Sequence, residues 1–147
     1  MKPGEFTFTM IKPTAVKLGK LVPILHEIDE AGFSVIAMKM TRLSRAQAER
    51  FYAIHKERPF FEELVFFMSS GPVLAAVLQK ENAVEDYRNL IGNTNPSDAK
   101  DGTIRKKFAI SVQENAVHGS DSDENALIEA NFFFSQFEIY PHDEEYG

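Results

Sequence analysis

The sequence of 147 residues contains no cysteine, which excludes disulfide bonds, thiolate zinc sites and thiol nucleophiles. It also lacks any run of about 18 consecutive apolar residues, the length that a membrane-spanning helix needs. Its first ten residues have neither the apolar core nor the small-residue cleavage site of a secretory signal. We therefore expect a soluble, cytoplasmic protein with no membrane partner.

Two common phosphate-binding motifs are missing as well. Gly19-Lys20 is followed by Leu21 and has no glycine at position 14, so there is no Walker A motif, and no Gly-x-Gly-x-x-Gly occurs. The four histidines have irregular spacings without a His-x-x-x-His pair, which argues against metal ligands supplied by the chain. A phosphate site would therefore have to be built from side chains.

Basic residues are scarce in the second part of the chain. Residues 1–60 carry 10 Lys and Arg against 6 acids, whereas residues 61–147 carry 6 against 16, and neither Lys nor Arg follows Lys107. A general nucleic-acid binder is not expected from this balance. An anion that meets His118, in the stretch ENAVHGSD, must be held by cations from earlier in the chain.

Size and apolar content indicate one compact domain over residues 1–147, since 44% of the side chains are hydrophobic and 13 are phenylalanine. Alternation and short apolar runs predict strands, and 3.6-residue periodicity predicts helices. The predicted strands are 5–12, 33–40 and 73–79, and the predicted helices are 21–32, 44–55, 60–71, 82–92 and 121–134. This alternation favours an α/β or α+β sandwich in which helices cover a sheet.

Local signals refine these elements. Ser44 and Gln47 form a capping-box pattern, and Asp121 is the expected N-cap of the last helix. EFTFTMIK suits a half-buried strand, whereas VLAAVLQ suits a central one. Residues 92–107 read as a long loop, and loops of this length are usually functional or disordered. Alternating Phe108, Ile110 and Val112 predict one more strand within 108–118.

Taken singly, the candidate site residues have ordinary explanations. His118 could be a strand-end histidine bonded to a helix start, and Arg88 and Arg105 could be solvated charges. Phe60 and Tyr52 would by default belong to the core. Only their combination points to chemistry.

The segments TMIKPTAV, FYAIHKERPFFEELVFFMSSGPV, TNPSDAKDGTIR and NAVHGSD, in that order and spacing, resemble the nucleoside diphosphate kinase family along nearly the whole chain. The short acidic end, SQFEIYPHDEEYG, is similar to bacterial members. The resemblance implies a ferredoxin-like βαββαβ antiparallel sheet with helices on one face, added helices outside, and a long functional loop near 92–115. It also implies a homo-oligomer, either a tetramer or a hexamer.

The resemblance further implies a ping-pong transfer of the γ-phosphoryl group from a nucleoside triphosphate to a nucleoside diphosphate, with broad base and sugar tolerance. His118 would carry the phosphoryl group, and Ser120 and Glu129 would orient its ring. Mg²⁺ would arrive on the nucleotide. The residues implied to hold the nucleotide are Lys12, Tyr52, Phe60, Arg88, Thr94, Arg105 and Asn115, with Phe60 against the base and Asn115 and Lys12 on the ribose hydroxyls.

The chemistry of these residue types agrees with such a site. An imidazole with an ordinary pKa of about 6.5 is largely neutral at pH 7 and offers a free ring nitrogen. Phosphoryl transfer mainly requires positioning and positive charge near the phosphate oxygens. Two alternatives remain open at this stage: a binding module without catalysis, and a phosphohistidine carrier that needs no base or ribose contacts.

Overall fold

The computed structural model describes residues 1–142, so the final acidic residues 143–147 lie outside the described residues. A four-stranded antiparallel sheet forms the centre, in the order β2-β3-β1-β4. Its strands are β1 (Phe6–Ile11), β2 (Ser34–Thr41), β3 (Val73–Gln79) and β4 (Val117–Gly119). The predicted central position of residues 73–79 is confirmed, because β3 pairs with both β1 and β2.

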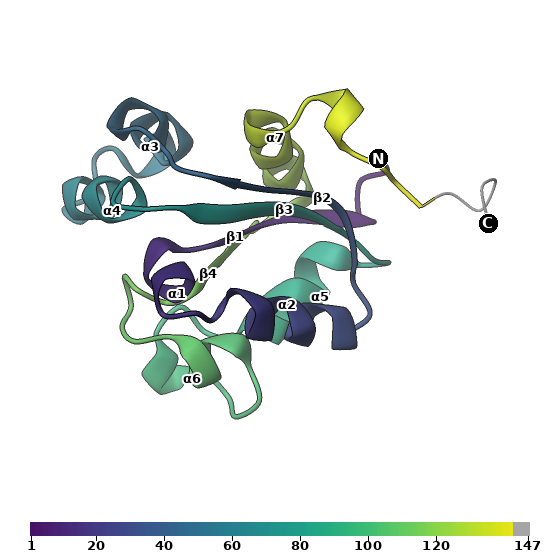
Figure 1. Ribbon diagram of the computed structural model, residues 1–147, viewed down its shortest axis with the longest axis horizontal. Coiled ribbons are helices and arrows are strands. Elements are labelled where there is room, and N and C mark those ends of the chain that lie inside the picture. The colour runs from purple at the N-terminus through teal and green to yellow at the C-terminus, as the bar shows by residue number, and fades with distance from the viewer. Residues whose placement is uncertain (143–147) are drawn as a thin grey trace.

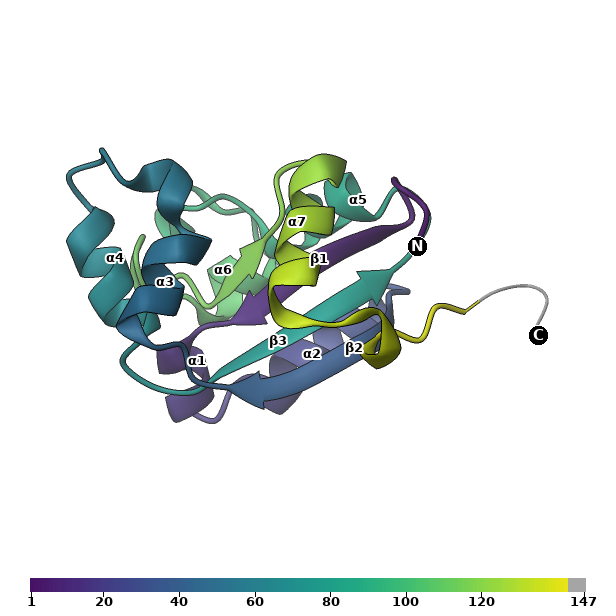
Figure 2. The same cartoon turned by 90° about the horizontal axis from the view of Figure 1, so that it is seen from above.

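Helices cover both faces of this sheet (Figure 1). One face carries α1 (Pro13–Lys17), α2 (Leu21–Glu30), α5 (Ala83–Ile91) and α6 (Ile104–Phe108), and the other carries α3 (Arg45–Phe51), α4 (Phe61–Met68) and α7 (Asp123–Phe133). The order β1-α2-β2-β3-α5-β4 is the expected ferredoxin-like βαββαβ arrangement. The added helices α3, α4 and α7 lie on the opposite face from α2 and α5, as Figure 2 also shows.

Because the sheet is covered on both faces, it separates two hydrophobic cores. Phe8, Met10 and Val65 belong to the core beneath α3, α4 and α7. Ile24 and Tyr87 belong to the core between the sheet, α2 and α5. The expectation that β1 is half-buried is therefore wrong, since all six of its residues are buried between two layers of helices.

Several helix boundaries follow the local sequence signals. The capping box is confirmed in both directions: Ser44 Oγ accepts from the Gln47 amide at 3.1 Å, and the Gln47 side chain accepts from the Ser44 amide at 2.8 Å. Pro23 occupies the first turn of α2, where its missing N–H costs no helical hydrogen bond. The α-helix that begins at Arg45 ends at Phe51, earlier than predicted, and a 3-10 helix spans Ala53–His55.

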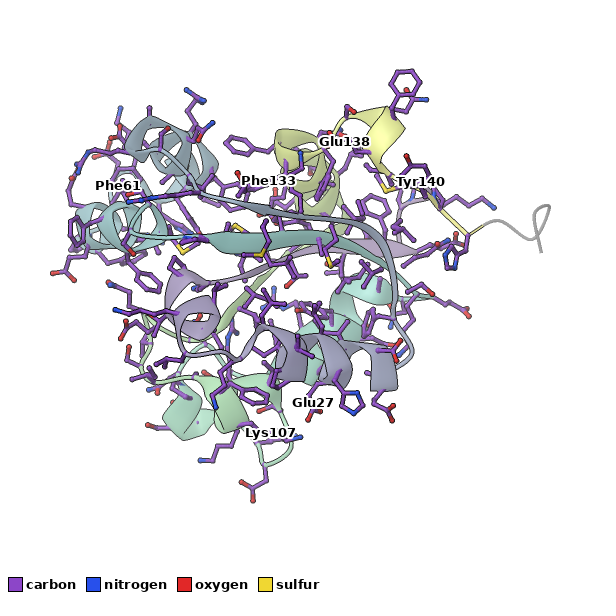
Figure 3. The ribbon with its side chains drawn as sticks, in the orientation of Figure 1. Glu27, Phe61, Lys107, Phe133, Glu138 and Tyr140 are labelled. Atoms are coloured by element: carbon purple, nitrogen blue, oxygen red, sulfur yellow. The ribbon has the colours of Figure 1, made fainter. Side chains whose placement is uncertain are left out.

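The segment 92–118 corrects two further expectations. Residues 92–107 are not a plain loop, because a 3-10 helix spans Pro96–Asp98 and α6 begins at Ile104. The alternation after Phe108 does not form a strand, since Ile110 and Val112 are more than half exposed and β4 contains only 117–119. Lys107 at the end of α6 pairs with Glu27 of α2 at 2.7 Å (Figure 3), which ties this segment to the helical layer.

The N-cap of the last helix lies one residue later than predicted. Ser122, and not Asp121, is the N-cap of α7, because the Ser122 hydroxyl accepts from the Asn125 amide at 3.0 Å. Asp121 instead accepts from the Asn125 side chain at 2.5 Å. None of the helices in residues 1–142 combines the length and the apolar character that crossing a membrane would require.

Candidate functional site

The backbone of His118 lies in the short strand β4, opposite Met10 of β1. Beside it, the Thr9 hydroxyl donates to the His118 carbonyl at 2.8 Å and lies 2.6 Å from the buried Tyr87 hydroxyl. Since the Thr9 proton is used on the carbonyl, the Tyr87 hydroxyl donates to Thr9. A buried hydrogen-bond chain from α5 through β1 thus fixes the backbone that carries His118.

The His118 ring is held by Glu129 of α7. Its Nε2 atom lies 2.9 Å from Glu129 Oε1, and both side chains are about four-fifths buried. The buried Ser120 hydroxyl donates to the same carboxylate oxygen at 2.6 Å. A carboxylate accepts, so the ring proton resides on Nε2 and Nδ1 keeps a free lone pair. The structure therefore brings together the three residues that the sequence analysis grouped as nucleophile and orienting partners.

Two buried cations lie close to this histidine. Lys12 follows β1, is 7% exposed, and its amide donates to the Ala116 carbonyl at 2.9 Å. Burial, and secondly the charge of Arg105, lower the pKa of the Lys12 ammonium to about 7. The guanidinium of Arg105 donates to the carbonyls of Gly92 and Val117, each at 2.9 Å. Both residues thus contact the chain immediately before His118, Lys12 at Ala116 and Arg105 at Val117.

Arg105 remains charged at neutral pH although it is buried. Burial lowers the pKa of Arg105 to about 10, the electrostatic effect of the nearby Tyr87 opposes that shift, and the positive charge of Arg88 adds to it. The sequence-predicted cation Arg88 therefore lies within electrostatic range of Arg105. Within residues 1–142, this electrostatic effect on Arg105 is what connects Arg88 to the candidate site.

Asn115 and Thr94 meet at the other side of the loop. The Asn115 side-chain amide donates to the Thr94 carbonyl at 3.3 Å, and Asn115 is buried while Thr94 is exposed. Three buried polar atoms of the candidate residues have no hydrogen-bond partner among residues 1–142: Asn115 Oδ1, Tyr52 Oη and Arg105 Nε. Unpaired buried polar atoms are costly, so these three atoms would gain from a polar partner such as water or a bound ligand.

Tyr52 and Phe60 have different surroundings. Tyr52 is buried, and its ring is edge-on to His118 with centroids 6.3 Å apart. Burial, and secondly the charge of Glu129, raise the pKa of the Tyr52 phenol far above its ordinary value, so it stays protonated. Phe60 is 47% exposed, so it does not belong to the core. Its ring centroid lies 5.5 Å from that of His55, which connects it to the site.

Sequence reasoning did not single out Thr9, Tyr87 or Phe51 as neighbours of the histidine. The Phe51 ring is edge-on to His118, with centroids 5.4 Å apart. Thr9 gave no signal in the sequence, because the alternation of residues 5–12 predicted a half-buried strand, whereas the structure buries Thr9 between two layers of helices. Phe51 gave no signal either, since a phenylalanine at the end of a helix is explained equally well by the core.

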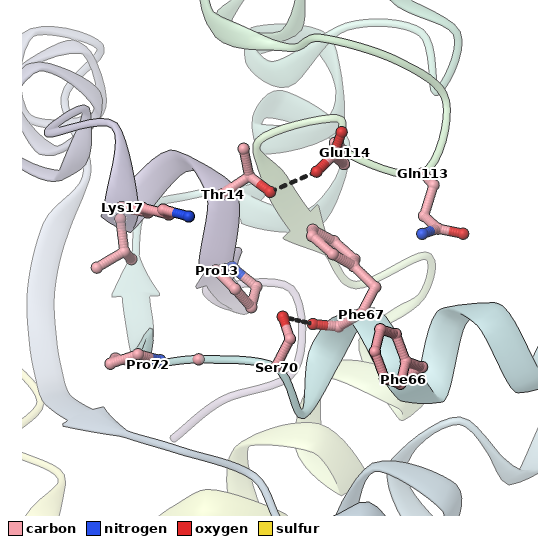
Figure 4. Close-up of a pocket in the computed structure, with 11 residues that line it drawn as sticks. Pro13, Thr14, Lys17, Phe66, Phe67, Ser70, Pro72, Gln113 and Glu114 are labelled. Atoms are coloured by element: carbon pink, nitrogen blue, oxygen red, sulfur yellow. Dashed lines mark hydrogen bonds between the residues drawn. The ribbon is translucent and has the colours of Figure 1, made fainter.

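A separate cavity of about 650 Å³ lies beside α1 and the end of α4 (Figure 4). It is lined by apolar side chains that include Pro13 and Phe66, and His118 is not part of its lining. At its edge the Thr14 hydroxyl donates to Glu114 at 2.7 Å. This bond anchors the residue before Asn115 to α1, so the cavity borders the candidate site without containing its chemistry.

A family model described as nucleoside diphosphate kinase matches residues 5–139. The chain is 60% identical over 129 residues to a nucleoside diphosphate kinase of Flavobacterium psychrophilum, covering 88% of this chain and 93% of that protein. It is 56% identical over 134 residues to one of Lawsonia intracellularis, covering 91% and 97%.

Solved structures agree with the sequence comparisons. The nucleoside diphosphate kinase of Aquifex aeolicus superposes with a TM-score of 0.90 at 45% identity, covering 92% of this chain and 98% of that chain. A halophilic nucleoside diphosphate kinase from Halobacterium salinarum, solved in complex with CDP, has a TM-score of 0.89 at 34% identity, covering 97% and 95%. Fold and sequence therefore lead to the same family.

Proposed function

The chain belongs to the nucleoside diphosphate kinase family, and from that membership we propose which of its residues perform the family's reaction. It is a phosphotransferase that moves the γ-phosphoryl group of a nucleoside triphosphate to a nucleoside diphosphate. The observation that carries the residue assignment is the His118 ring, whose Nε2 is held by Glu129 while Nδ1 stays free. We assign the role of phosphoryl carrier to His118.

In the first half-reaction, Nδ1 of His118 attacks the γ-phosphorus of the triphosphate. A nitrogen–phosphorus bond forms, the bond from the γ-phosphorus to its bridging oxygen breaks, and the diphosphate leaves with that electron pair. The proton on Nε2 stays in place, so the phosphorylated ring is positively charged and the Glu129 carboxylate stabilises it. A diphosphate acceptor then reverses these steps.

Lys12, Arg88 and Arg105 are proposed to hold the phosphates. Positive groups fixed in a buried site stabilise the charge that develops on the transferring phosphoryl oxygens more strongly than groups in water do. Buried Lys12 and Arg105 satisfy this condition.

We assign Tyr52 and Thr94 to the phosphate end, Asn115 and Lys12 to the ribose hydroxyls, and exposed Phe60 to the base. The CDP complex of the Halobacterium relative supports nucleotide binding by the fold.

Mg²⁺ is the cofactor that we propose, and it would enter bound to the nucleotide. Residues 1–142 contain no cluster of three or more His, Asp or Glu side chains placed as metal ligands. The charged groups on the nucleotide side are cations, and Glu129 is already engaged by His118 and Ser120. This set fits an ion coordinated by phosphate oxygens and water. When bound, Mg²⁺ would neutralise charge on the β- and γ-phosphates.

Three wider assignments belong to the same proposal. Residues 1–147 form one domain that acts in the cytoplasm on nucleoside diphosphates and triphosphates. The chain assembles as a tetramer or hexamer, which is supported by the exposed apolar side chains Val35, Met38 and Met40 on the edge strand β2. Native mass spectrometry tests the assembly, because a monomer of 16.6 kDa would contradict it.

The central test is labelling without an acceptor. Purified protein mixed with γ-labelled ATP and Mg²⁺ should take up one acid-labile, base-stable phosphoryl group per chain, and added diphosphate should remove it. His118→Ala should abolish labelling and turnover, whereas His26→Ala should retain both, since His26 is exposed on α2. Label that survives acid, or that persists in His118→Ala, would show that another residue is the acceptor.

A further inference from the structure

The His118 ring is enclosed by other aromatic rings as well as by its hydrogen bond to Glu129. Phe51 makes the shortest of these ring contacts, with centroids 5.4 Å apart and an interplanar angle of 74°. Phe8 follows at 6.0 Å and 56°, and Tyr52 at 6.3 Å and 86°. Edge-to-face pairs at these separations are attractive and orient the two rings relative to each other.

Phe51 is itself fixed by rings from two other elements. Its centroid lies 6.0 Å from Phe8 of β1, 5.3 Å from Phe132 and 5.6 Å from Phe133, both on α7. The same helix carries Glu129, which binds the other side of the imidazole. Phe51 therefore connects the end of α3 to the helix that sets the hydrogen bond of the histidine.

A single hydrogen bond to Glu129 does not by itself fix the orientation of the imidazole. The ring can rotate about its Cβ–Cγ bond or change rotamer, and an intramolecular hydrogen bond opposes such motion by only about 1 kcal/mol net. A neighbouring ring packed against the imidazole removes the space that rotation requires. The Phe51 contact and the Glu129 bond together restrict the imidazole to one orientation.

We propose that Phe51 is a positioning residue that, with Glu129, determines which nitrogen of His118 receives the phosphoryl group. The inference rests on the proposed function of His118. With Phe51 in place, Nε2 stays on Glu129 and Nδ1 is the nitrogen that attacks. Without the Phe51 ring, the imidazole gains orientations in which Nε2 leaves the carboxylate and competes for the γ-phosphorus.

The experiment compares Phe51→Leu with Phe132→Leu. Both remove one ring from the same cluster, but among the ring pairs in residues 1–142 only Phe51 of these two contacts His118. Each variant is labelled with ATP and Mg²⁺, and ³¹P NMR of the labelled protein measures the fractions on Nδ1 and Nε2. The kcat and KM values are measured in parallel.

Wild type and Phe132→Leu should carry label on Nδ1 alone. Phe51→Leu should carry a measurable fraction on Nε2, with kcat lowered about tenfold and KM for the nucleotide unchanged, the scale for losing one aromatic pair. Phe132→Leu should keep kcat within about twofold. Phe51→Met serves as the second variant if Phe51→Leu does not fold, because methionine fills irregular space without a ring.

The possible failures can be distinguished. Absence of acid-labile label on the wild type would overturn the proposed function of His118. Phe51 variants labelled only on Nδ1, with kcat equal to that of Phe132→Leu, would overturn the role of Phe51 alone. Wild-type label on Nε2 would overturn that role and also the assignment of Nδ1 as the attacking nitrogen. In both cases the labelling of His118 itself would still stand.

Discussion

The Lys12 side chain is assigned to bind phosphates as an ammonium, although its burial disfavours the charged form. It is 7% exposed at the end of β1, and burial, with the charge of Arg105 second, lowers its pKa to about 7. The free protein therefore holds Lys12 partly neutral at neutral pH and largely neutral at pH 8. A bound polyphosphate supplies the missing negative charge and should restore the ammonium.

Nucleotide binding should consequently take up a proton. At pH 8 we expect uptake close to one proton per site, because roughly nine-tenths of a group with a pKa near 7 is deprotonated at that pH. Isothermal titration calorimetry with ADP in two buffers of different ionisation enthalpy measures this number. Lys12→Arg, which keeps a permanent cation, should show almost none, and equal uptake by both proteins would contradict the assignment.

The same lowered pKa fixes the sign of a stability effect. Between about pH 7 and 9 the unfolded chain holds a Lys12 proton that the folded protein has lost, so the free energy of unfolding should rise with pH. In Lys12→Met this rise should be smaller, whereas Lys20→Met should keep it, since Lys20 is exposed. Urea unfolding at several pH values provides the comparison.

At the scale of elements, the segment between α5 and β4 presents Arg105 to the site. Gly92 ends α5 with a φ of +86°, and its carbonyl accepts from Arg105. A Cβ at Gly92 would lie 2.6 Å from Thr103 Oγ1 and 2.7 Å from Thr103 Cβ. Thr103 is the N-cap of α6, so Gly92, Thr103 and Arg105 form one packed unit.

Gly92→Ala should therefore cost both stability and activity. Gly102→Ala is the matched control, because Gly102 has a φ of +90° but no atom within 4 Å of an added Cβ. The backbone strain alone should cost about 1–3 kcal/mol in either variant. The steric clash should make Gly92→Ala measurably less stable in urea and lower its kcat as Arg105 shifts. Equal losses in the two variants would contradict this account.

The elements that the sequence predicted are those with several periodic residues of their own. β3 has seven residues, all but the last fully buried, and α5 has an apolar face that includes Tyr87 and Ile91, so local patterns were sufficient. α6 and β4 have five and three residues, too few for a period to emerge. β4 forms only because β1 offers it hydrogen bonds from a distant part of the chain.

The site shows the same limit. The roles of His118, Lys12 and Arg105 were predicted through the family resemblance. The contact between His118 and Glu129 could not be predicted from their spacing, because it depends on how α7 packs over β1. The Thr9 bond to the His118 carbonyl likewise depends on the strand register. Positions that act through packing, such as Phe51, carried no chemical signal in the sequence.

At the scale of the whole molecule, folding joins two regions of opposite charge. Residues 1–60 have a surplus of 4 positive charges, and residues 61–147 have a surplus of 10 negative ones. Lys12 comes from the first region and His118 from the second, and Arg88 and Arg105 are cations within the acidic region. The cationic surroundings of the histidine thus exist only in the folded chain, which explains why no contiguous phosphate motif was found.

The base is assigned to the outer end of this arrangement, where Phe60 is 47% exposed. Stacking on an aromatic ring tolerates every base, so kcat/KM should differ by less than about a hundredfold among purine and pyrimidine, ribo- and deoxyribonucleotides. Phe60→Ala should raise KM for all of them, by the loss of a contact worth about 1–3 kcal/mol, and leave kcat nearly unchanged.

Steady-state kinetics with several diphosphate acceptors measure this range. Phe66→Ala is the control, because Phe66 is also an exposed phenylalanine, lies within α4 and lines the separate cavity of Figure 4. Its KM should stay at the wild-type value, since no nucleotide contact is assigned to it. Strong preference for one base would require polar contacts to a base edge, and a Phe60→Ala variant that lost kcat without a change in KM would place Phe60 at the reacting phosphates and not at the base.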